Sequence, residues 1–274
     1  MTNRIDTIFK TQRDEHRKGL MPFVCGGHPT PESLPTLLPA LEAGGASIVE
    51  IGIPFSDPIA DGPVIAAAMH EALQSGVRPG TIFDQVRAAR ESVGLGLVAM
   101  ISVSLVEGLG GPAAFSKRAS EAGFDGLIVP DCPLDEAGRI RDAAGEHGLT
   151  LSLLVAPTTP PKRAAEIAQA CTGFVYLVAR AGITGERADA PKIEPMTGAI
   201  REATDIPIAC GFGISTPEHV AAVVEHADAA IVGSALVRRL ADAQNESRDL
   251  AETAKGYTQE LAAGLAAATA EAGE

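Results

Sequence analysis

The stretch SIVEIGIPFSDPIADG, residues 47–62, contains both the strand pattern that decides the fold and the first candidate functional residue. Its first seven residues are mostly apolar and β-branched, which is typical of a buried parallel strand, and a proline-containing acidic loop follows. Glu50 lies in the middle of the apolar run, although burying a carboxylate is costly unless the group is paired or protonated. The stretch therefore predicts an α/β protein and raises the question of what Glu50 does.

Short apolar runs typical of buried strands recur along the chain and alternate with helical patterns. Helical patterns such as SLPTLLPALEAG (33–44) and EHVAAVVEHA (218–227) separate the apolar runs. Eight strands that are apolar on both faces predict a parallel (β/α)8 TIM barrel, although their number alone leaves a doubly wound sheet open. We expect the strands at residues 20–26, 47–53, 96–103, 125–131, 149–157, 173–180, 206–212 and 228–234.

The length of the chain fits one such barrel. It has 274 residues, and a barrel of this type takes about 250. No linker or break in composition divides the sequence, so residues 1–274 are predicted to form a single domain, with a closing helix and an Ala-rich tail over 244–274. Thr-Pro pairs at 30–31, 159–160 and 216–217 are expected to begin helices.

Composition narrows the class of function. The net charge of −13 argues against nucleic acid or an anionic membrane as partner, because both require a basic surface. Residues 1–19 lack the apolar core of a signal peptide, and no apolar run approaches a membrane span, so a cytoplasmic protein is expected. Neither a disulfide framework nor a metal site is expected, because no ligand spacing connects the cysteines, Cys25, Cys132, Cys171 and Cys210.

Glycine-rich segments follow the last two expected strands, GFGIS (211–215) and GSAL (233–236). In a barrel these loops meet at the C-terminal mouth, where active sites lie. Glycine lets backbone N–H groups approach an anion closely, and Ser234 begins a helix whose N-terminus favours negative charge. Gly213, Gly233 and Ser234 are therefore candidates for binding a phosphate group, with a pair of tight turns as the alternative.

A third glycine-rich loop, RAGITGER (180–187), follows the sixth expected strand. Gly182 and Gly185 suit a lid that closes over a substrate, and Thr184 offers a hydroxyl. An ordinary flexible connection is the alternative interpretation.

The acidic residues of the opening stretch are the candidates for chemistry. Side chains alternate along a strand, so Glu50 shares a face with Ile48 and is predicted to point into the barrel. A partly desolvated carboxylate there has a raised pKa and can act as an acid or base near neutral pH. A structural ion pair with Arg180 is the alternative. Asp57 and Asp61 lie on the following loop, where each is also compatible with ordinary turn chemistry.

Four segments, taken together and in order, resemble the tryptophan synthase alpha subunit family over essentially the whole chain. They are MPFV (21–24), EIGIPFSDPIADGPVI (50–65), YLVARAGITG (176–185) and GFGIS (211–215). The resemblance implies retro-aldol cleavage of indole-3-glycerol phosphate to indole and D-glyceraldehyde 3-phosphate, in tryptophan biosynthesis, with no metal or organic cofactor in this chain. It also implies a β subunit that carries pyridoxal phosphate and receives the indole through a tunnel, in an α2β2 tetramer.

The resemblance also implies roles for individual residues. Glu50 corresponds to the general acid–base, Asp61 to the carboxylate that holds the indole N–H, and Asp57 lies in the loop that communicates with the β subunit. Phe23, Tyr176, Thr184 and Phe212 match residues that line the substrate pocket. Gly185, Gly213, Gly233 and Ser234 match the phosphate site.

Four positions depart from the family pattern. Ser102 and Ser104 stand where the family usually has a tyrosine and an asparagine, and Ala66 and Glu71 replace a glutamine and an arginine. The first pair bears on coupling to the β subunit.

Three alternatives stay open: a sugar-phosphate isomerase or epimerase on a similar barrel, a stand-alone lyase that releases free indole, and a weakly catalytic regulatory subunit.

Overall fold

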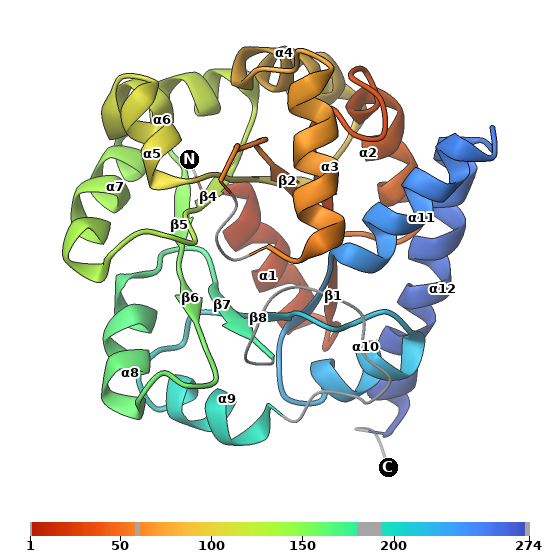
Figure 1. Ribbon diagram of the computed structural model, residues 1–274. Helices are drawn as coiled ribbons and strands as arrows, with labels where there is room; N and C mark the ends of the chain where they lie inside the picture. Colours follow the sequence, from red (N-terminus) through yellow and green to blue (C-terminus); the bar gives the residue numbers. More distant parts are fainter. Residues whose placement is uncertain (1, 58–60, 180–192, 272–274) are drawn as a thin grey trace.

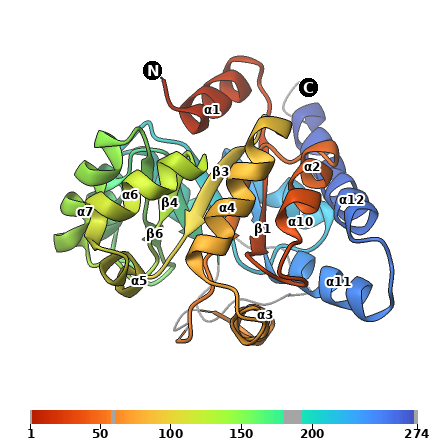
Figure 2. The ribbon, with the colours of Figure 1, turned by 90° about the horizontal axis from the view of Figure 1, so that it is seen from above.

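The structure is a computed structural model that describes residues 2–57, 61–179 and 193–271 (Figure 1). Parallel strands form its centre and helices surround them (Figures 1 and 2). The strands are β1 Gly19–Cys25, β2 Ile48–Gly52, β3 Gly96–Met100, β4 Gly126–Ile128, β5 Thr150–Ser152, β6 Leu154–Val155, β7 Val175–Val178, β8 Ile208–Gly211 and β9 Ala229–Val232.

Helices connect successive strands, with α1 in front of the first strand and two helices after each of β2, β3 and β9. They are α1 Arg4–Asp14, α2 Leu34–Ala43, α3 Pro63–Gln74, α4 Pro79–Ala89, α5 Val103–Gly108, α6 Gly111–Ala122, α7 Leu134–Glu146, α8 Pro161–Ala170, α9 Glu194–Arg201, α10 Pro217–Val224, α11 Ser234–Asn245 and α12 Leu250–Glu271, with a short 3-10 turn η1 at Arg90–Ser92. Among the described residues, no helix combines the length and the apolar composition needed to cross a membrane.

The sheet closes on itself. Its strand order is β5-β4-β3-β2-β1-β9-β8-β7-β6, and the two outermost segments are parts of one strand that Leu153 interrupts. At the interruption the backbone N–H of Leu153 donates to the sulfur of Cys171 at 3.3 Å. The predicted eight-stranded TIM barrel is thus confirmed, and the doubly wound alternative is excluded.

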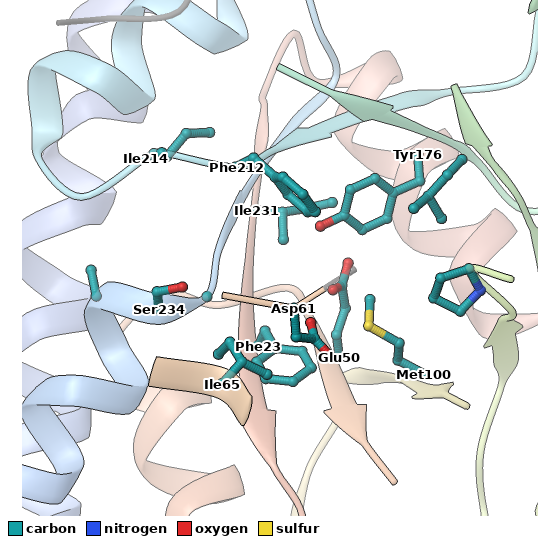
Figure 3. Close-up of a pocket in the computed structure, with 15 residues that line it drawn as sticks. Phe23, Glu50, Asp61, Ile65, Met100, Tyr176, Phe212, Ile214, Ile231 and Ser234 are labelled. Atoms are coloured by element: carbon teal, nitrogen blue, oxygen red, sulfur yellow. The ribbon is translucent and has the colours of Figure 1, made fainter. Parts of the chain in front are cut away.

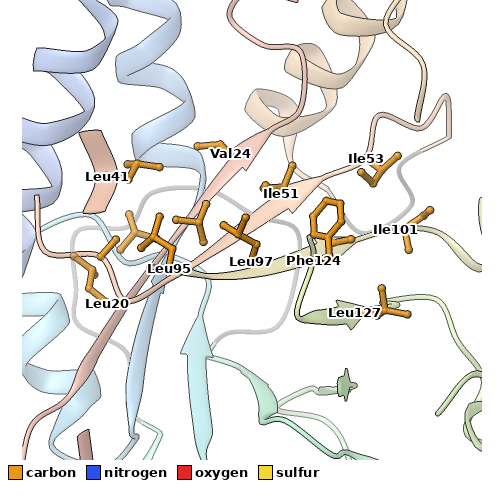
Figure 4. Packing of buried hydrophobic residues seen from close by; sticks show 14 of the residues in the cluster. Leu20, Val24, Leu41, Ile51, Ile53, Leu95, Leu97, Ile101, Phe124 and Leu127 are labelled. Carbon is orange, nitrogen blue, oxygen red and sulfur yellow. The ribbon is translucent and has the colours of Figure 1, made fainter. Parts of the chain in front are cut away.

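Side-chain alternation divides the apolar residues into two layers. Leu20, Val24, Ile51 and Leu97 face outward and pack under the helices (Figure 4). The opposite faces of the strands fill the barrel interior, where Met21, Ile48, Val98, Ile128, Phe174 and Ile231 form a second cluster. Because successive side chains of a strand point to opposite faces, each strand is apolar on both sides.

Helix α1 closes the N-terminal end of the barrel. Ile5 and Phe9 are buried in the interior cluster, and the Phe9 ring lies 5.9 Å from that of Phe174. This end is therefore filled with side chains. A cavity in the interior can consequently lie only towards the opposite end, where the strands finish.

The three Thr-Pro pairs differ in what they do. Thr216 caps α10 as predicted, since its hydroxyl accepts the backbone N–H of His219 at 3.3 Å. The other two predictions are wrong in detail. The Thr159 hydroxyl accepts the N–H of Ala156 instead, and α8 begins at Pro161. The pair at 30–31 lies in a turn, and helix α2 begins only after this turn, at Leu34.

The closing helix α12 packs against α10 at Gly264. A Cβ atom there would lie 2.1 Å from the carbonyl oxygen of Pro217, whereas one at exposed Gly256 of the same helix would meet no atom within 4 Å. Gly264→Ala is expected to lower the free energy of unfolding by about 1–3 kcal/mol through overpacking. Gly256→Ala, the matched control, should raise it by up to ~1 kcal/mol through helix propensity. Urea unfolding of both variants would measure the change in the free energy of unfolding. Equal changes in the two variants would contradict close packing of α12 against α10 at Gly264.

Candidate active site

A cavity opens at the C-terminal mouth of the barrel (Figure 3). It holds about 630 Å³ of space free of protein atoms, including open solvent at its entrance. Strands, strand-to-helix loops and the first turn of α11 all contribute to its wall. The lining residues are Phe23, Glu50, Asp61, Ile65, Met100, Pro130, Leu154, Tyr176, Phe212, Gly213, Ile214, Ile231, Gly233, Ser234 and Ala235.

Glu50 lies on the floor of this cavity. It pairs in register with Phe23 of β1 and Val98 of β3, and its side chain points inward with Ile48, as the alternation predicted. The residue is 0% exposed, and neither carboxyl oxygen has a hydrogen-bond partner among the described residues. Burial therefore raises the pKa of Glu50 well above its ordinary value of 4.5. Arg180, the alternative ion-pair partner, lies outside the described residues.

Asp61 brings a second carboxyl group to the same cavity. It precedes α3 and lies beside Glu50 (Figure 3). Partial burial raises the pKa of Asp61 to about 6. Burial raises the pKa of both carboxyl groups, and Glu50 is the more completely enclosed of the two. Two carboxyl groups in such different environments can perform different chemical roles.

The walls of the cavity are aromatic and aliphatic. The rings of Tyr176 and Phe212 meet edge to face, with centroids 6.3 Å apart and planes at 81°. Burial and then the charge of Glu50 raise the pKa of the Tyr176 hydroxyl well above its ordinary value. Phe23 lies across the cavity from these two rings (Figure 3). The resulting apolar slot suits a flat aromatic ligand.

Backbone groups and a helix N-terminus form one end of the cavity. Phe212 and Gly213 both have positive φ angles, 79° and 82°, which turn the chain sharply after β8. Gly233 is the N-cap residue of α11, and Ser234 begins that helix. Figure 3 shows Ser234 at the end away from Met100. Helix N-termini and closely approaching glycine backbones favour anions, so this end suits a phosphate group.

Several lining residues were not foreseen from the sequence. Met100 and Ile231 lie on interior faces of strands, two residues from Val98 and Gly233, so the alternation contained a signal for both. Ile65 on α3 and Ile214 after β8 gave no comparable signal, because a loop or helix residue faces the cavity only through the path of its backbone. The other unforeseen residues are Pro130, Leu154 and Ala235.

Four predicted residues are not assembled with the others. Thr184 and Gly185, together with Gly182, lie outside the described residues, so the structure does not place them. Asp57 does not line this cavity: it lines a neighbouring one, which also touches Asp61. Apart from Asp57 and the loop at 180–187, the structure thus brings the predicted site residues together. They are Phe23, Glu50, Asp61, Tyr176, Phe212, Gly213, Gly233 and Ser234.

Comparison with known proteins places this arrangement in one family. The family model described as "Tryptophan synthase alpha chain" matches residues 9–266. The tryptophan synthase alpha chain of Solibacter usitatus is 41% identical over 267 residues, which cover 96% of this chain and 98% of that protein. That of Chloroflexus aggregans is 43% identical over 263 residues, covering 94% and 97%.

Solved structures agree with the sequence relatives. The crystal structure of tryptophan synthase subunit alpha from Legionella pneumophila superposes with a TM-score of 0.87 at 31% identity, covering 97% of this chain and 100% of that one. A structure of Mycobacterium tuberculosis tryptophan synthase gives a TM-score of 0.86 at 34% identity, covering 97% and 99%. The barrel, the cavity at its mouth and these matches over nearly the full length show that the chain belongs to the tryptophan synthase alpha chain family.

Proposed function

We propose that this chain cleaves indole-3-glycerol phosphate to indole and D-glyceraldehyde 3-phosphate, as a carbon–carbon lyase of L-tryptophan biosynthesis. The observation that carries the proposal is the pairing of Glu50 and Asp61 in one apolar cavity whose far end is built from Gly213, Gly233 and Ser234. Family membership supports the same reaction. A sugar-phosphate isomerase or epimerase binds a substrate without an aromatic ring, so the aromatic slot does not favour that alternative.

The substrate's two ends match the two ends of the cavity. Its phosphate would bind at Gly213, Gly233 and Ser234, and its indole ring would lie in the slot between Phe23 and Phe212. This orientation places the glycerol chain along the cavity floor, next to Glu50. The N–H group of the indole would donate to Asp61.

Glu50 would transfer protons in this reaction. Since burial raises its pKa and favours the protonated form, Glu50 would deliver that proton to carbon 3 of the indole ring. The Glu50 carboxylate then removes the proton of the adjacent side-chain hydroxyl, and the carbon–carbon bond breaks as a carbonyl group forms. The bonding electrons return to the ring, which becomes neutral indole, and Glu50 ends in its starting state.

Asp61 would stabilise charge instead of moving protons. Protonation of carbon 3 leaves positive charge on the indole nitrogen, and an ionised carboxylate beside that nitrogen lowers the energy of this state. With a pKa of about 6, Asp61 is ionised at neutral pH. The two carboxyl groups thus suit the two different requirements of the cleavage.

We also infer that the chain works with a tryptophan synthase β subunit, in an α2β2 tetramer, and holds no organic cofactor itself. Pyridoxal phosphate would belong to the β subunit. Family membership supports the partnership. Asp57 and Phe55 line a second cavity at the same mouth of the barrel. A partner bound there could change the conformation of the loop that carries Asp57 and Asp61. The departures at Ser102 and Ser104 bear on how strongly the two subunits are coupled.

Indole release from indole-3-glycerol phosphate, measured with and without a β subunit from the same source, tests the proposal. We expect slow release by the isolated chain and faster release in the complex. Unchanged turnover and sedimentation would identify a stand-alone lyase. Activation of the β subunit without indole release would identify a regulatory subunit, and no release under either condition would refute the lyase activity.

Glu50→Gln is expected to lower kcat by ~10²–10⁴, the usual contribution of a positioned acid–base group, while substrate still binds. The chain has no tryptophan, so the fluorescence of the ligand's indole reports binding without interference from protein indoles. Glu121→Gln, on the exposed face of α6, is the matched control and should keep full turnover. Near wild-type turnover of Glu50→Gln would show that Glu50 is structural.

The same variant should change how stability depends on pH. Because the folded-state pKa of Glu50 lies above 4.5, the folded wild type binds more protons than the unfolded chain between the two pKa values. Its stability therefore falls as pH rises through that window. Glu50→Gln lacks this titration, so its Tm relative to wild type should increase as the pH rises above 4.5. A constant difference would contradict the burial of an ionisable group.

Asp61→Asn keeps the shape and a hydrogen-bond acceptor but loses the charge. We expect a fall in kcat of ~10²-fold, comparable to the removal of one electrostatic stabiliser. Wild-type kcat/KM should decline as pH falls through about 6, since protonation neutralises Asp61. This decline should be missing in Asp61→Asn. Its persistence would assign the titration to another group.

Ser234 tests the anion site. Inorganic phosphate should raise the Tm of the wild type, because a ligand that binds only the folded state stabilises it. Ser234→Asp should abolish this rise and increase KM by on the order of tenfold, about 1.4 kcal/mol. An acidic residue at a helix N-terminus is otherwise favourable, so the fold should persist. Ser234→Ala, which adds no charge, should have a smaller effect, and equal protection of all three proteins would contradict the assignment.

A further inference from the structure

We propose that a second cavity beside the first lets this enzyme accept substrates substituted on the nitrogen-side edge of the indole ring, with Ser102 as the residue that keeps the space open. The inference rests on the proposed function and defines its substrate class more closely. The second cavity holds about 730 Å³ of space free of protein atoms, open solvent included.

The two cavities adjoin each other. Asp61, Met100 and Pro130 line both of them, so these three residues form the boundary between the spaces. Met100 contributes an unbranched, flexible side chain to that boundary, which can adjust to a group placed against it. Figure 3 shows Met100 at the end of the first cavity away from Ser234. The second cavity therefore begins where the ring of a bound substrate would end.

The orientation of the substrate determines which ring atom meets this boundary. With the phosphate at Ser234, carbon 3 at Glu50 and the N–H group at Asp61, the ring edge next to the nitrogen faces Asp61 and Met100. In indole, carbon 7 lies on that edge. Carbon 4 lies on the opposite edge, which carries carbon 3 and faces the packed interior around Glu50. A substituent on carbon 7 would therefore extend towards the second cavity, and one on carbon 4 would not.

The lining of the second cavity suits an apolar substituent. Its apolar residues are Ile53, Phe55, Met69, Met100, Ile101 and Pro130. Two of its polar side chains, Ser102 and Asp131, already have partners within the protein: the Ser102 hydroxyl donates to Asp131 at 2.7 Å, and the Val103 backbone N–H donates to the same carboxylate at 2.9 Å. An apolar group entering this space would leave these hydrogen bonds intact, and it would gain burial.

Ser102 is the small residue on this lining. It lies just after β3, at the N-cap of α5, where its hydroxyl accepts the N–H of Ser104 at 3.2 Å. A large side chain at this position would enter the second cavity without touching the first, because Ser102 does not line the first. The position can thus control the extra space independently of Glu50 and Asp61.

The test compares three substrates on the full-length chain: indole-3-glycerol phosphate and its derivatives methylated at ring carbon 7 or ring carbon 4. We expect kcat/KM for the 7-methyl substrate within about threefold of the parent, and a loss of about tenfold or more for the 4-methyl substrate, the usual effect of a misplaced methyl group in a closed pocket. Equal discrimination against the two methylated substrates would overturn the inference. This comparison requires no variant.

Two variants then assign the effect to the second cavity. Ser102→Tyr fills the space and should lower the 7-methyl to parent ratio of kcat/KM by about tenfold or more. Ser102→Ala loses the same hydrogen bonds to Asp131 and Ser104 without filling the space, so it should leave the ratio unchanged. An unchanged ratio in Ser102→Tyr would overturn the inference, whereas failure of the wild type to cleave the parent substrate would refute the proposed function itself.

Discussion

The burial of Glu50 without a hydrogen-bond partner among the described residues is the constraint on which the rest of the site depends. A carboxyl group in that position is costly to ionise, so burial favours its protonated form, as the proposed acid–base role requires. The register of β2 between Phe23 and Val98 maintains the position. A slip of one residue would turn Glu50 outward under the helices and bring an apolar side chain into the cavity.

The closed barrel produces a cavity at one end because the other end is filled. Ile5 and Phe9 of α1 pack into the interior at the N-terminal end. Towards the strand ends the interior widens between Tyr176, Phe23 and the loops, and both carboxyl groups meet there. Glu50 is more deeply enclosed than Asp61, and this difference in burial separates their pKa values and hence their proposed roles.

The turn after β8, at one end of the cavity, contains backbone strain. Phe212 is a bulky residue with a φ of 79°, a conformation that costs of order 1–3 kcal/mol. This conformation directs its ring against Tyr176 and leads directly into Gly213 at the cavity wall. Glycine at position 211 leaves room for the Tyr176 ring, because a Cβ atom there would lie 2.7 Å from the Tyr176 hydroxyl oxygen. One short turn thus positions an aromatic wall and a backbone suited to phosphate.

The sequence by itself determined the strand-and-helix alternation, the parallel direction of the strands and the face of β2 that carries Glu50, whereas the strand order of the structure decided that the sheet closes. The first three features follow from local periodicity, since apolar runs predict buried strands and alternation assigns a face. Motif resemblance added the role of Asp61, the aromatic residues and the assignment of Gly185 to the phosphate site. The Thr-Pro pair at 30–31 shows the limit of local rules, because its threonine has the right chemistry for a cap, yet α2 begins only at Leu34.

Only the tertiary structure decided which residues share a space. Met100, Pro130 and Asp61 are far apart in the chain, and they meet because strand order and loop paths bring three strand ends together. The same arrangement places Asp57 outside the first cavity although only three residues separate it from Asp61. The physical reason is that periodicity records the face of a strand on which a side chain lies, whereas a cavity depends on the distances between strands and on the course of the loops that join them.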